Sequence, residues 1–327
     1  MADTAHPAPR ADPTLVRRLR ERVSGDVLAD EPLAAHTTIK VGGPAAALVR
    51  AETPADLAAV AELCRELDRP WLILGRGSNL LVADDGWPGV VVTLGRGFRG
   101  LDIDGETVTA GAAERMPALA AKASAAGLAG FAFGVAIPGS LGGAVRMNAG
   151  AHGSEMADVL VWADVIRLAQ AGKAQRLSAA DLRMGYRRTD LPADAVVVRA
   201  ALRLRHADAD TLRREMAEMK RWRRAHQPVN TPSCGSVFTN PPGDSAGRLI
   251  DATGMKGYRV GGARVSPVHA NFITVEPDAT AGDVHAVLTA VQTGVADAHG
   301  VRLQPEVVLV GFDDAYGTER HPWSAER

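Results

Sequence analysis

The sequence has few of the residues that build disulfides, metal sites or basic surfaces. Cysteine occurs only twice, as Cys64 and Cys234, too few for a disulfide scaffold or a four-cysteine metal site, and this fits a reducing compartment. Because His-Glu-x-x-His, Cys-x-x-Cys and Asp-rich loops are all missing, we expect no metal. Lysine and arginine total 37 against 38 aspartates and glutamates, a net charge of -1. A protein that binds nucleic acid usually carries a basic excess, so no such partner is expected.

Long apolar runs are also missing. No uncharged apolar stretch approaches the roughly 20 residues of a membrane helix. The Ala/Pro-rich segment 1–12 lacks the apolar run of a secretory signal. We therefore expect a soluble, cytoplasmic protein with no membrane partner and no evident obligate protein partner. The length of 327 residues allows two domains or three small ones.

Periodicity predicts strands interspersed with helices, which indicates an α+β fold. A break near 206–210 separates two units, and polar tails are expected at 1–11 and 318–327. A short helix is predicted from Ser178 to about Gly185. The other expected helices span 13–23, 54–67, 116–126, 211–224, 246–253 and 281–299. The expected strands span 71–74, 90–94, 101–103, 107–109, 161–168, 196–204, 260–265, 271–275 and 307–310.

Two glycine-rich segments carry the strongest chemical signal. The first glycine segment, 75–81 (Gly-Arg-Gly-Ser-Asn-Leu-Leu), follows a predicted strand. Main-chain N–H groups in such a turn can form a nest for phosphate oxygens, although a plain turn explains the two glycines equally well. It is neither a dinucleotide fingerprint nor a P-loop, since the third glycine and the Gly-Lys-Ser/Thr are missing. The second glycine segment, 137–150, has four glycines, which allow close approach to a flat ring or a pyrophosphate, or a tight crossing of packed elements. Together the two favour a large nucleotide cofactor.

Several further positions keep two interpretations each. The segment 37–45 either contacts a cofactor or begins a strand. Ser236 lacks the Gly-x-Ser-x-Gly elbow, so it suits a proton donor or ligand contact better than an acylated nucleophile, and a structural serine remains as plausible. Glu306 is a polar strand end or a positioned catalytic carboxylate. His269 is a buried core imidazole or a ligand contact. The cluster 220–224 is interpreted as a solvated helix face, with a diphosphate contact as the alternative.

The segments between about 33 and 311 resemble the UDP-N-acetylenolpyruvoylglucosamine reductase family, and they follow one another in the same order as in that family. Members of the family make UDP-N-acetylmuramate for bacterial cell walls. The matching motifs lie at 75–81, 137–150, 185–187, 232–241, 265–272 and 303–307. The resemblance implies a two-lobed FAD-binding unit of the vanillyl-alcohol-oxidase type and a C-terminal α+β substrate-binding domain. The corresponding division is a tail and helix at 1–32, the FAD-binding domain at 33–206, the substrate-binding domain at 207–315 and a tail at 316–327.

The resemblance also implies the ligands and the residues that serve them. The cofactor is FAD, the reductant is NADPH and the substrate is UDP-N-acetylglucosamine enolpyruvate. Arg187, Ser236 as proton donor and Glu306 match the catalytic residues, while Tyr186, Asn240 and His269 are expected to bind substrate. The residues expected to hold FAD are Thr38, Lys40, Val41, Gly42, Gly43, Gly75, Arg76, Gly77, Ser78, Asn79, Leu80, Ile137, Pro138, Gly139, Ser140, Gly142, Gly143, Asn148 and Gly150.

The sequence departs from the family pattern in places. No tyrosine lies between Arg187 and Cys234, so the chain resembles the short form that lacks an inserted tyrosine loop. His226 stands where a lysine commonly precedes Gln-Pro, and Arg188-Thr189 follow the Tyr-Arg pair where an acidic residue and a serine are frequent. One rival is another FAD-dependent oxidase of the superfamily, although the glycine segments contain no His or Cys for a covalent flavin. A nucleotide-binding module without catalysis is the other.

Overall fold

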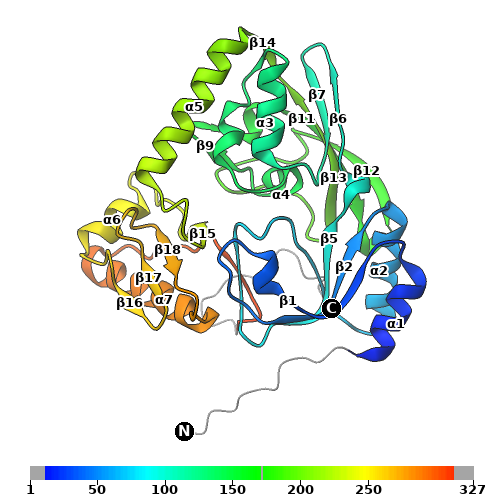
Figure 1. The fold of residues 1–327 in the computed structure, drawn as a ribbon, viewed down its shortest axis with the longest axis horizontal. Helices are drawn as coiled ribbons and strands as arrows, with labels where there is room; N and C mark the ends of the chain where they lie inside the picture. Colours follow the sequence, from blue (N-terminus) through cyan, green and yellow to red (C-terminus); the bar gives the residue numbers. More distant parts are fainter. Residues whose placement is uncertain (1–11, 171, 313–327) are drawn as a thin grey trace, which may run out of the picture.

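The computed structural model describes residues 12–170 and 172–312, and the tails predicted at 1–11 and 318–327 lie outside this range. These residues form three lobes that surround a common centre (Figure 1). The first lobe holds the sheet β1-β2-β5-β3, in which β2 and β3 run parallel to β5 and β1 is antiparallel to β2. Its elements are α1 (Pro13–Arg22), β1 (Val27–Pro32), β2 (Pro44–Ala51), α2 (Pro54–Glu66), β3 (Trp71–Ile73) and β5 (Trp87–Leu94).

The helices of the first lobe begin at the residues where the sequence predicts them. The Asp12 carboxylate accepts the N–H of Thr14, and Pro13 occupies the first turn of α1. In α2, Thr53 and Asp56 form a capping box, in which each side chain accepts the other's main-chain N–H. The Asp56 carboxylate also accepts the N–H of Ser24. Because hydrogen bonds to its charged form outweigh burial, the pKa of Asp56 is lowered.

The second lobe is an antiparallel sheet in the order β12-β11-β13-β7-β6. Its elements are β6 (Leu101–Asp104), β7 (Thr107–Gly111), α3 (Met116–Ala125), β8 (Leu128–Ala129), α4 (Leu141–Arg146), β9 (Gly150–Ala151), β10 (Ser154–Glu155), β11 (Leu160–Arg167), β12 (Lys173–Ser178), β13 (Ala195–Arg203), β14 (Arg205–His206) and α5 (Ala209–His226). Met216 of α5 joins the core of this lobe, whereas Ile166 and Val196 from the sheet join the core of the first lobe. The two lobes are therefore packed together.

The third lobe is tied to the first by the end of the chain. It holds the sheet β15-β18-β17-β16, and β19 leaves it to pair in parallel with β4. The Asp84 carboxylate accepts the N–H groups of Ala281 and Gly282 at the start of α7, each over 2.8 Å. The elements of the third lobe are β15 (Ser233–Ser236), α6 (Ala246–Ala252), β16 (Arg259–Val260), β17 (Ala263–Val265), β18 (Phe272–Val275), α7 (Ala281–His299) and β19 (Val308–Val310). The partner of β19 is β4 (Leu80–Val82). The pairing brings the residues before β19 to the end of the first glycine segment.

The structure confirms the α+β fold but corrects some elements. The helix predicted from Ser178 to Gly185 is wrong, because residues 179–183 form turns that end at Arg183 with φ of 38°. The Asp181 N–H does bond to Ser178 Oγ, as in a helix cap. The preceding strand β12 was not predicted, since its side chains are nearly all exposed and show no apolar alternation. The strand predicted at 260–265 is a hairpin of β16 and β17.

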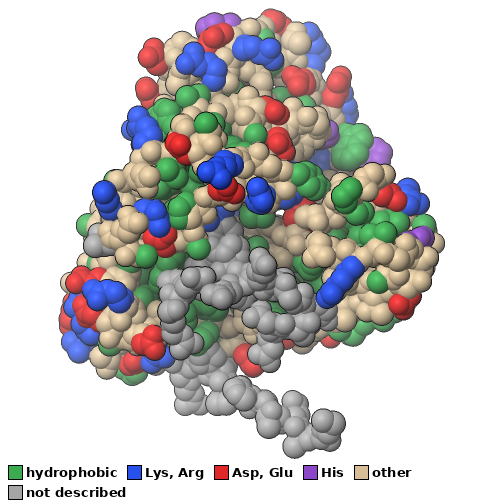
Figure 2. Space-filling model, turned by 180° about the vertical axis from the view of Figure 1, so that it is seen from behind, with side chains coloured by type: hydrophobic (Ala, Val, Ile, Leu, Met, Phe, Trp, Pro, Cys, Tyr) green, Lys and Arg blue, Asp and Glu red, His purple; other side chains and the backbone are tan. Residues whose placement is uncertain are grey.

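The distribution of charged side chains on the surface agrees with the nearly equal numbers of basic and acidic residues in the sequence. On the face shown in Figure 2, lysine and arginine side chains are interspersed with aspartates and glutamates over all three lobes. Of the helices in the described part of the chain, none combines the length and apolar character needed to cross a bilayer.

Candidate active site

A cavity of about 560 Å³ lies where the three lobes meet. This volume is within the range of about 300–1,000 Å³ typical of ligand and cofactor sites. Both glycine segments line it, and so do Arg187, Ser236 and Glu306 from distant parts of the chain. The predicted cofactor residues on its wall are Gly75, Arg76, Gly77, Ser78, Asn79, Leu80, Ile137, Pro138, Gly139, Ser140, Gly142, Gly143 and Gly150.

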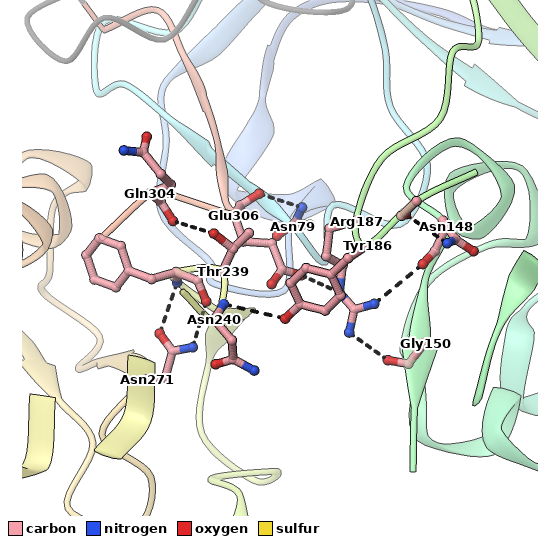
Figure 3. A network of polar contacts seen from close by, with 12 residues as sticks. Asn79, Asn148, Gly150, Tyr186, Arg187, Thr239, Asn240, Asn271, Gln304 and Glu306 are labelled. Carbon is pink, nitrogen blue, oxygen red and sulfur yellow. Dashed lines mark hydrogen bonds and ion pairs between the residues drawn. The ribbon is translucent and has the colours of Figure 1, made fainter. Parts of the chain in front are cut away.

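Arg187 is held from three sides (Figure 3). Its Nε lies 3.2 Å from Oε1 of Glu306, an ion pair with side chains only 20% and 15% exposed. Its terminal nitrogens donate to the main-chain carbonyls of Asn148, over 3.4 Å, and Gly150, over 3.1 Å. Because Arg187 has φ of 53°, the main chain is strained there, as it often is at functional sites. The guanidinium is thus fixed beside a carboxylate on the cavity wall.

Asn148 supports Arg187 without lining the cavity itself. Its side chain is fully buried, with Nδ2 donating to the carbonyl of Gly185 over 2.9 Å and Oδ1 accepting the N–H of Ala157 over 2.9 Å. Asn148 also has a positive φ, 42°, a conformation that asparagine tolerates better than most residues. The side chain therefore ties the second glycine segment to the turn that carries Arg187.

Glu306 precedes β19, and the main chain on both sides of it is anchored. Its N–H donates to the carbonyl of Val237 over 2.8 Å, and its own carbonyl accepts the side-chain amide of Asn79 over 3.0 Å. Burial raises the pKa of Glu306, while the neighbouring Arg187 cation acts in the opposite direction. The site therefore favours the neutral form of this carboxyl more than water does.

Ser236 ends β15 and pairs with Phe272 of the neighbouring strand β18. The preceding Gly235 has φ of 78°, a conformation that glycine adopts without strain. Cys234, on the same strand, is 1% exposed, and burial raises the pKa of its thiol to about 12. A thiolate nucleophile is therefore disfavoured here, whereas Ser236 lines the same cavity as Arg187 and Glu306.

At several glycines of the two segments, a side chain would collide with a neighbouring part of the protein. A Cβ on Gly75 would lie 2.9 Å from the Oγ of Ser140, and one on Gly142 would lie 3.0 Å from the Cβ of Ala112. Gly77 has φ of 59°, and a Cβ there would lie 2.4 Å from the carbonyl oxygen of His36. These contacts support the tight crossing of packed elements that was one interpretation of the second segment. The same glycines also line the cavity, so their main chain is where the ring and phosphates of FAD could approach it closely.

The segment Thr38–Gly43 is placed behind the first glycine segment and does not line the cavity. The Thr38 hydroxyl donates to the carbonyl of Ser233 over 2.7 Å, and Val41 is buried in the core of the third lobe. Lys40 has φ of 66°, and its Nζ donates to the carbonyl of Ala35. A Cβ on Gly42 or Gly43 would clash with Val82 or Asp84. The segment buttresses the cavity wall from outside.

The predicted substrate residues lie beside the cavity lining. The Tyr186 hydroxyl accepts the main-chain N–H of Asn240 over 3.5 Å, and its ring lies 4.9 Å from the Arg187 guanidinium (Figure 3). The Asn240 side chain accepts the N–H of Ala246 over 3.0 Å. His269 accepts the N–H of Asn271 at Nδ1, and burial lowers its pKa. His269 thus has the satisfied imidazole that was one of its two interpretations.

Several cavity residues were not predicted. The interpretation of 220–224 as a solvated face holds for Lys220, Arg221 and Arg224. The 46% exposed Trp222 and the half-buried Arg223 also line the cavity. Trp222 stacks on His226, with ring centroids 4.6 Å apart, and its isolated indole within a charged helix was the signal that could have identified it. Arg99, Arg146, His152 and Gln227 also line the cavity.

Arg146 is the most deeply buried of these cations. It donates to the carbonyls of Pro192, over 3.1 Å, and Ala195. Burial lowers the pKa of Arg146 to about 9, with Asp194 acting in the opposite direction. The guanidinium therefore stays charged at neutral pH and braces the wall formed by residues 193–197.

Comparisons with known proteins agree with this geometry. Residues 45–178 match an FAD binding domain, and residues 227–310 match the C-terminal domain of UDP-N-acetylenolpyruvoylglucosamine reductase. The chain is 45% identical over 301 residues to the UDP-N-acetylenolpyruvoylglucosamine reductase of Heliobacterium modesticaldum, covering 90% of this chain and 95% of that protein. The chain belongs to the UDP-N-acetylenolpyruvoylglucosamine reductase family.

Other members of this family support the assignment over nearly the whole chain. The reductase of Bacillus subtilis is 39% identical over 299 residues, covering 91% of this chain and 98% of that protein. The crystal structure of the reductase from Thermus caldophilus matches with a TM-score of 0.75 at 38% identity, covering 88% of this chain and 98% of that one. The expected fold, an FAD-binding unit followed by the reductase family's C-terminal domain, is therefore confirmed.

Proposed function

We propose that the protein uses NADPH to reduce UDP-N-acetylglucosamine enolpyruvate to UDP-N-acetylmuramate, a step in making peptidoglycan precursors. The reaction adds a hydride at C3 and a proton at C2 of the enolpyruvyl group, and NADPH is oxidised to NADP⁺. FAD, when bound by the glycine segments, supplies the hydride chemistry. A cytoplasmic location and a division into FAD-binding residues 33–206 and substrate-binding residues 207–315 belong to this proposal.

One observation supports it most. Arg187 and Glu306, which are 119 positions apart in the chain, form an ion pair on the wall of the cavity that Ser236 and both glycine segments line. A cofactor site alone does not need these three groups. A reaction that develops negative charge on a carboxylate and then takes up a proton does.

Each of the three side chains has a distinct task in this reaction. Hydride addition at C3 places negative charge on the substrate carboxylate, and the Arg187 guanidinium can bind a carboxylate through two parallel hydrogen bonds. Since burial raises its pKa, a protonated Glu306 can donate a further hydrogen bond to that charge. The Ser236 hydroxyl then protonates C2, which is feasible because a carbon-centred enolate is a strong base.

The UDP part of the substrate is proposed to bind near the third lobe. Tyr186, Asn240 and His269 remain the proposed contacts, and Arg223, a half-buried cation on the cavity wall, offers a charge where His226 replaces the family's lysine. The sequence between Arg187 and Cys234 contains no tyrosine, which supports the short form of the enzyme.

The experiment is an anaerobic cycle in two steps. NADPH is added to the FAD-loaded protein without oxygen, and the loss of flavin absorbance is followed. The enolpyruvyl UDP-sugar is then added. Recovery of the absorbance together with UDP-N-acetylmuramate in the product supports the proposal, whereas recovery with oxygen only would indicate an oxidase.

A further inference from the structure

Asn271 is a buried amide whose side chain bonds the chain just after Ser236 (Figure 3). It directly precedes β18 and is 4% exposed. Its Oδ1 accepts the N–H of Phe238 over 2.9 Å, and its Nδ2 donates to the carbonyl of the same residue over 2.8 Å. One side chain therefore makes the two hydrogen bonds that a residue of a neighbouring antiparallel strand would make.

This contact follows a place where the pairing of β15 with β18 is irregular. Ser233 pairs with Thr274, and Ser236 pairs with Phe272, so two residues of β15 lie opposite one residue of β18. Gly235, with φ of 78°, is one of these two residues. A bulge of this kind redirects a side chain and interrupts the regular hydrogen bonds of the strand pair. The strand that carries Ser236 is then held by the Asn271 side chain instead.

The segment held by Asn271 in turn holds the main chain of Glu306. The carbonyl of Asn271 accepts the N–H of Val237 over 3.0 Å, and the carbonyl of Val237 accepts the N–H of Glu306 over 2.8 Å. Phe238 forms an isolated bridge with Pro305. Residues 237–238 are therefore bonded both to Asn271 and to the segment that carries Glu306.

Asn271 does not itself line the cavity, and its surroundings are apolar. Val237, Phe238, Ala270 and Ile273 all belong to the buried core of the third lobe. An amide in such a core is costly unless its hydrogen bonds are made. An aliphatic side chain could fill the space, but it would leave both main-chain groups of Phe238 without this partner.

We propose that Asn271 is a positioning residue for reduction of the sugar, because its amide sets Ser236 and Glu306 at a fixed separation on the cavity wall. The inference rests on the proposed function, which gives these two side chains their tasks. The Ser236 hydroxyl must reach C2 while Glu306 contacts the substrate carboxylate, and a displacement of about 1 Å can cost as much as 10²-fold in rate. Reduction of the flavin by NADPH uses neither side chain and does not need this alignment.

The test follows the two half-reactions of Asn271→Ala separately, at a temperature at which each variant is folded. Reduction of the flavin by NADPH should stay within about twofold of wild type, while reduction of the sugar should fall roughly ten- to hundredfold. Asn271→Asp, which loses the donor to the Phe238 carbonyl, should show the same difference and serves if the alanine variant does not fold. The control is Val295→Ala, which opens the same core. It should lower stability and leave both half-reactions near wild type.

Two further readouts separate positioning from a general loss of stability. In a Ser236→Ala background, Asn271→Ala should slow sugar reduction by only about threefold or less, because the effects of residues that act as a unit are not additive. Amide hydrogen exchange, followed by NMR, should be faster at the Glu306 N–H in Asn271→Ala than in Val295→Ala, since the bond to Val237 is loosened.

Equal losses in both half-reactions, the same loss with and without the Ser236 hydroxyl, or Glu306 exchange no faster than in Val295→Ala would each overturn the inference. A wild-type protein that does not reduce the sugar would refute the proposed function instead. Faster exchange at Glu306 in Asn271→Ala would in that case still support the positioning of Glu306 by Asn271, and unchanged exchange would overturn it.

Discussion

The side-chain amide of Asn79 donates a 3.0 Å hydrogen bond to the main-chain carbonyl of Glu306, 227 positions further along the chain. The carbonyl of Asn79 in turn accepts the N–H of Val308 over 3.0 Å. The first glycine segment, where FAD is expected, is therefore fixed to the strand entry that carries the carboxylate. These contacts couple the position of the first glycine segment to that of Glu306.

The raised pKa of Glu306 predicts a pH dependence of stability. Between its ordinary pKa of 4.5 and the higher value in the folded protein, the folded state holds more protons than the unfolded state. The free energy of unfolding therefore falls as pH rises through this window. Glu306→Gln stays neutral and should lack this contribution, so wild type should lose stability relative to the variant as pH rises from about 4.5.

Urea unfolding of both proteins between pH 4.5 and 8 checks this, with Glu276→Gln as a surface control because Glu276 is a half-exposed ion-pair partner. A wild type that gains stability relative to Glu306→Gln as pH rises would mean that Arg187 dominates burial and that the carboxyl is ionised.

Asn148→Ala tests the support of Arg187. The change leaves the Gly185 carbonyl and the Ala157 N–H without their partner, and we expect a loss of about 1–3 kcal/mol in the free energy of unfolding. The rate of sugar reduction should fall more than FAD affinity, because the turn that carries Arg187 is released. Asn148→Asp is the matched variant, since it keeps the acceptor for Ala157 but loses the donor to Gly185. An Asn148→Ala protein in which the FAD affinity and the rate of sugar reduction fall by the same factor would contradict this account.

Gly75→Ala tests whether the close contact between the two glycine segments shapes the cofactor site. The new Cβ would lie 2.9 Å from the Ser140 side chain, so one wall of the cavity must shift, and FAD binding should weaken about tenfold or more. Gly105→Ala serves as the control: its φ is 55° and nothing lies within 4 Å. It should lower thermal stability while FAD titration remains as in wild type. A Gly75→Ala protein with wild-type FAD affinity would remove the segment from the cofactor site.

The sequence predicts elements whose causes are local. The caps at Asp12 and Thr53 fix where α1 and α2 begin, and the capping box of Thr280 and Asp283 does the same for α7, which matches its predicted range. The apolar residues of β11 and β13 likewise locate these strands, and in the structure both sides of each strand face a core. These signals need no knowledge of which elements are neighbours.

Features that depend on packing between lobes could not be predicted in the same way. The strand β12 is recognised only by its pairing with β11, since its residues are nearly all exposed. Trp222 and Arg223 lie in a helix whose charge pattern indicates a solvated face, and they line the cavity only because residues of the other lobes complete its wall. Thr38 shows the reverse case: its motif predicts a cofactor contact, whereas the structure places it behind the cavity wall.

Ser236→Ala, followed through both half-reactions, tests the central claim most directly. Ser233→Ala is the matched control, because Ser233 lies on the same strand but does not line the cavity. The account predicts that NADPH reduces the flavin of Ser236→Ala at nearly the wild-type rate, while reduction of the enolpyruvyl sugar falls by roughly 10²–10⁴, the effect of a positioned acid. Equal losses in both half-reactions, or wild-type sugar reduction without the Ser236 hydroxyl, would contradict it.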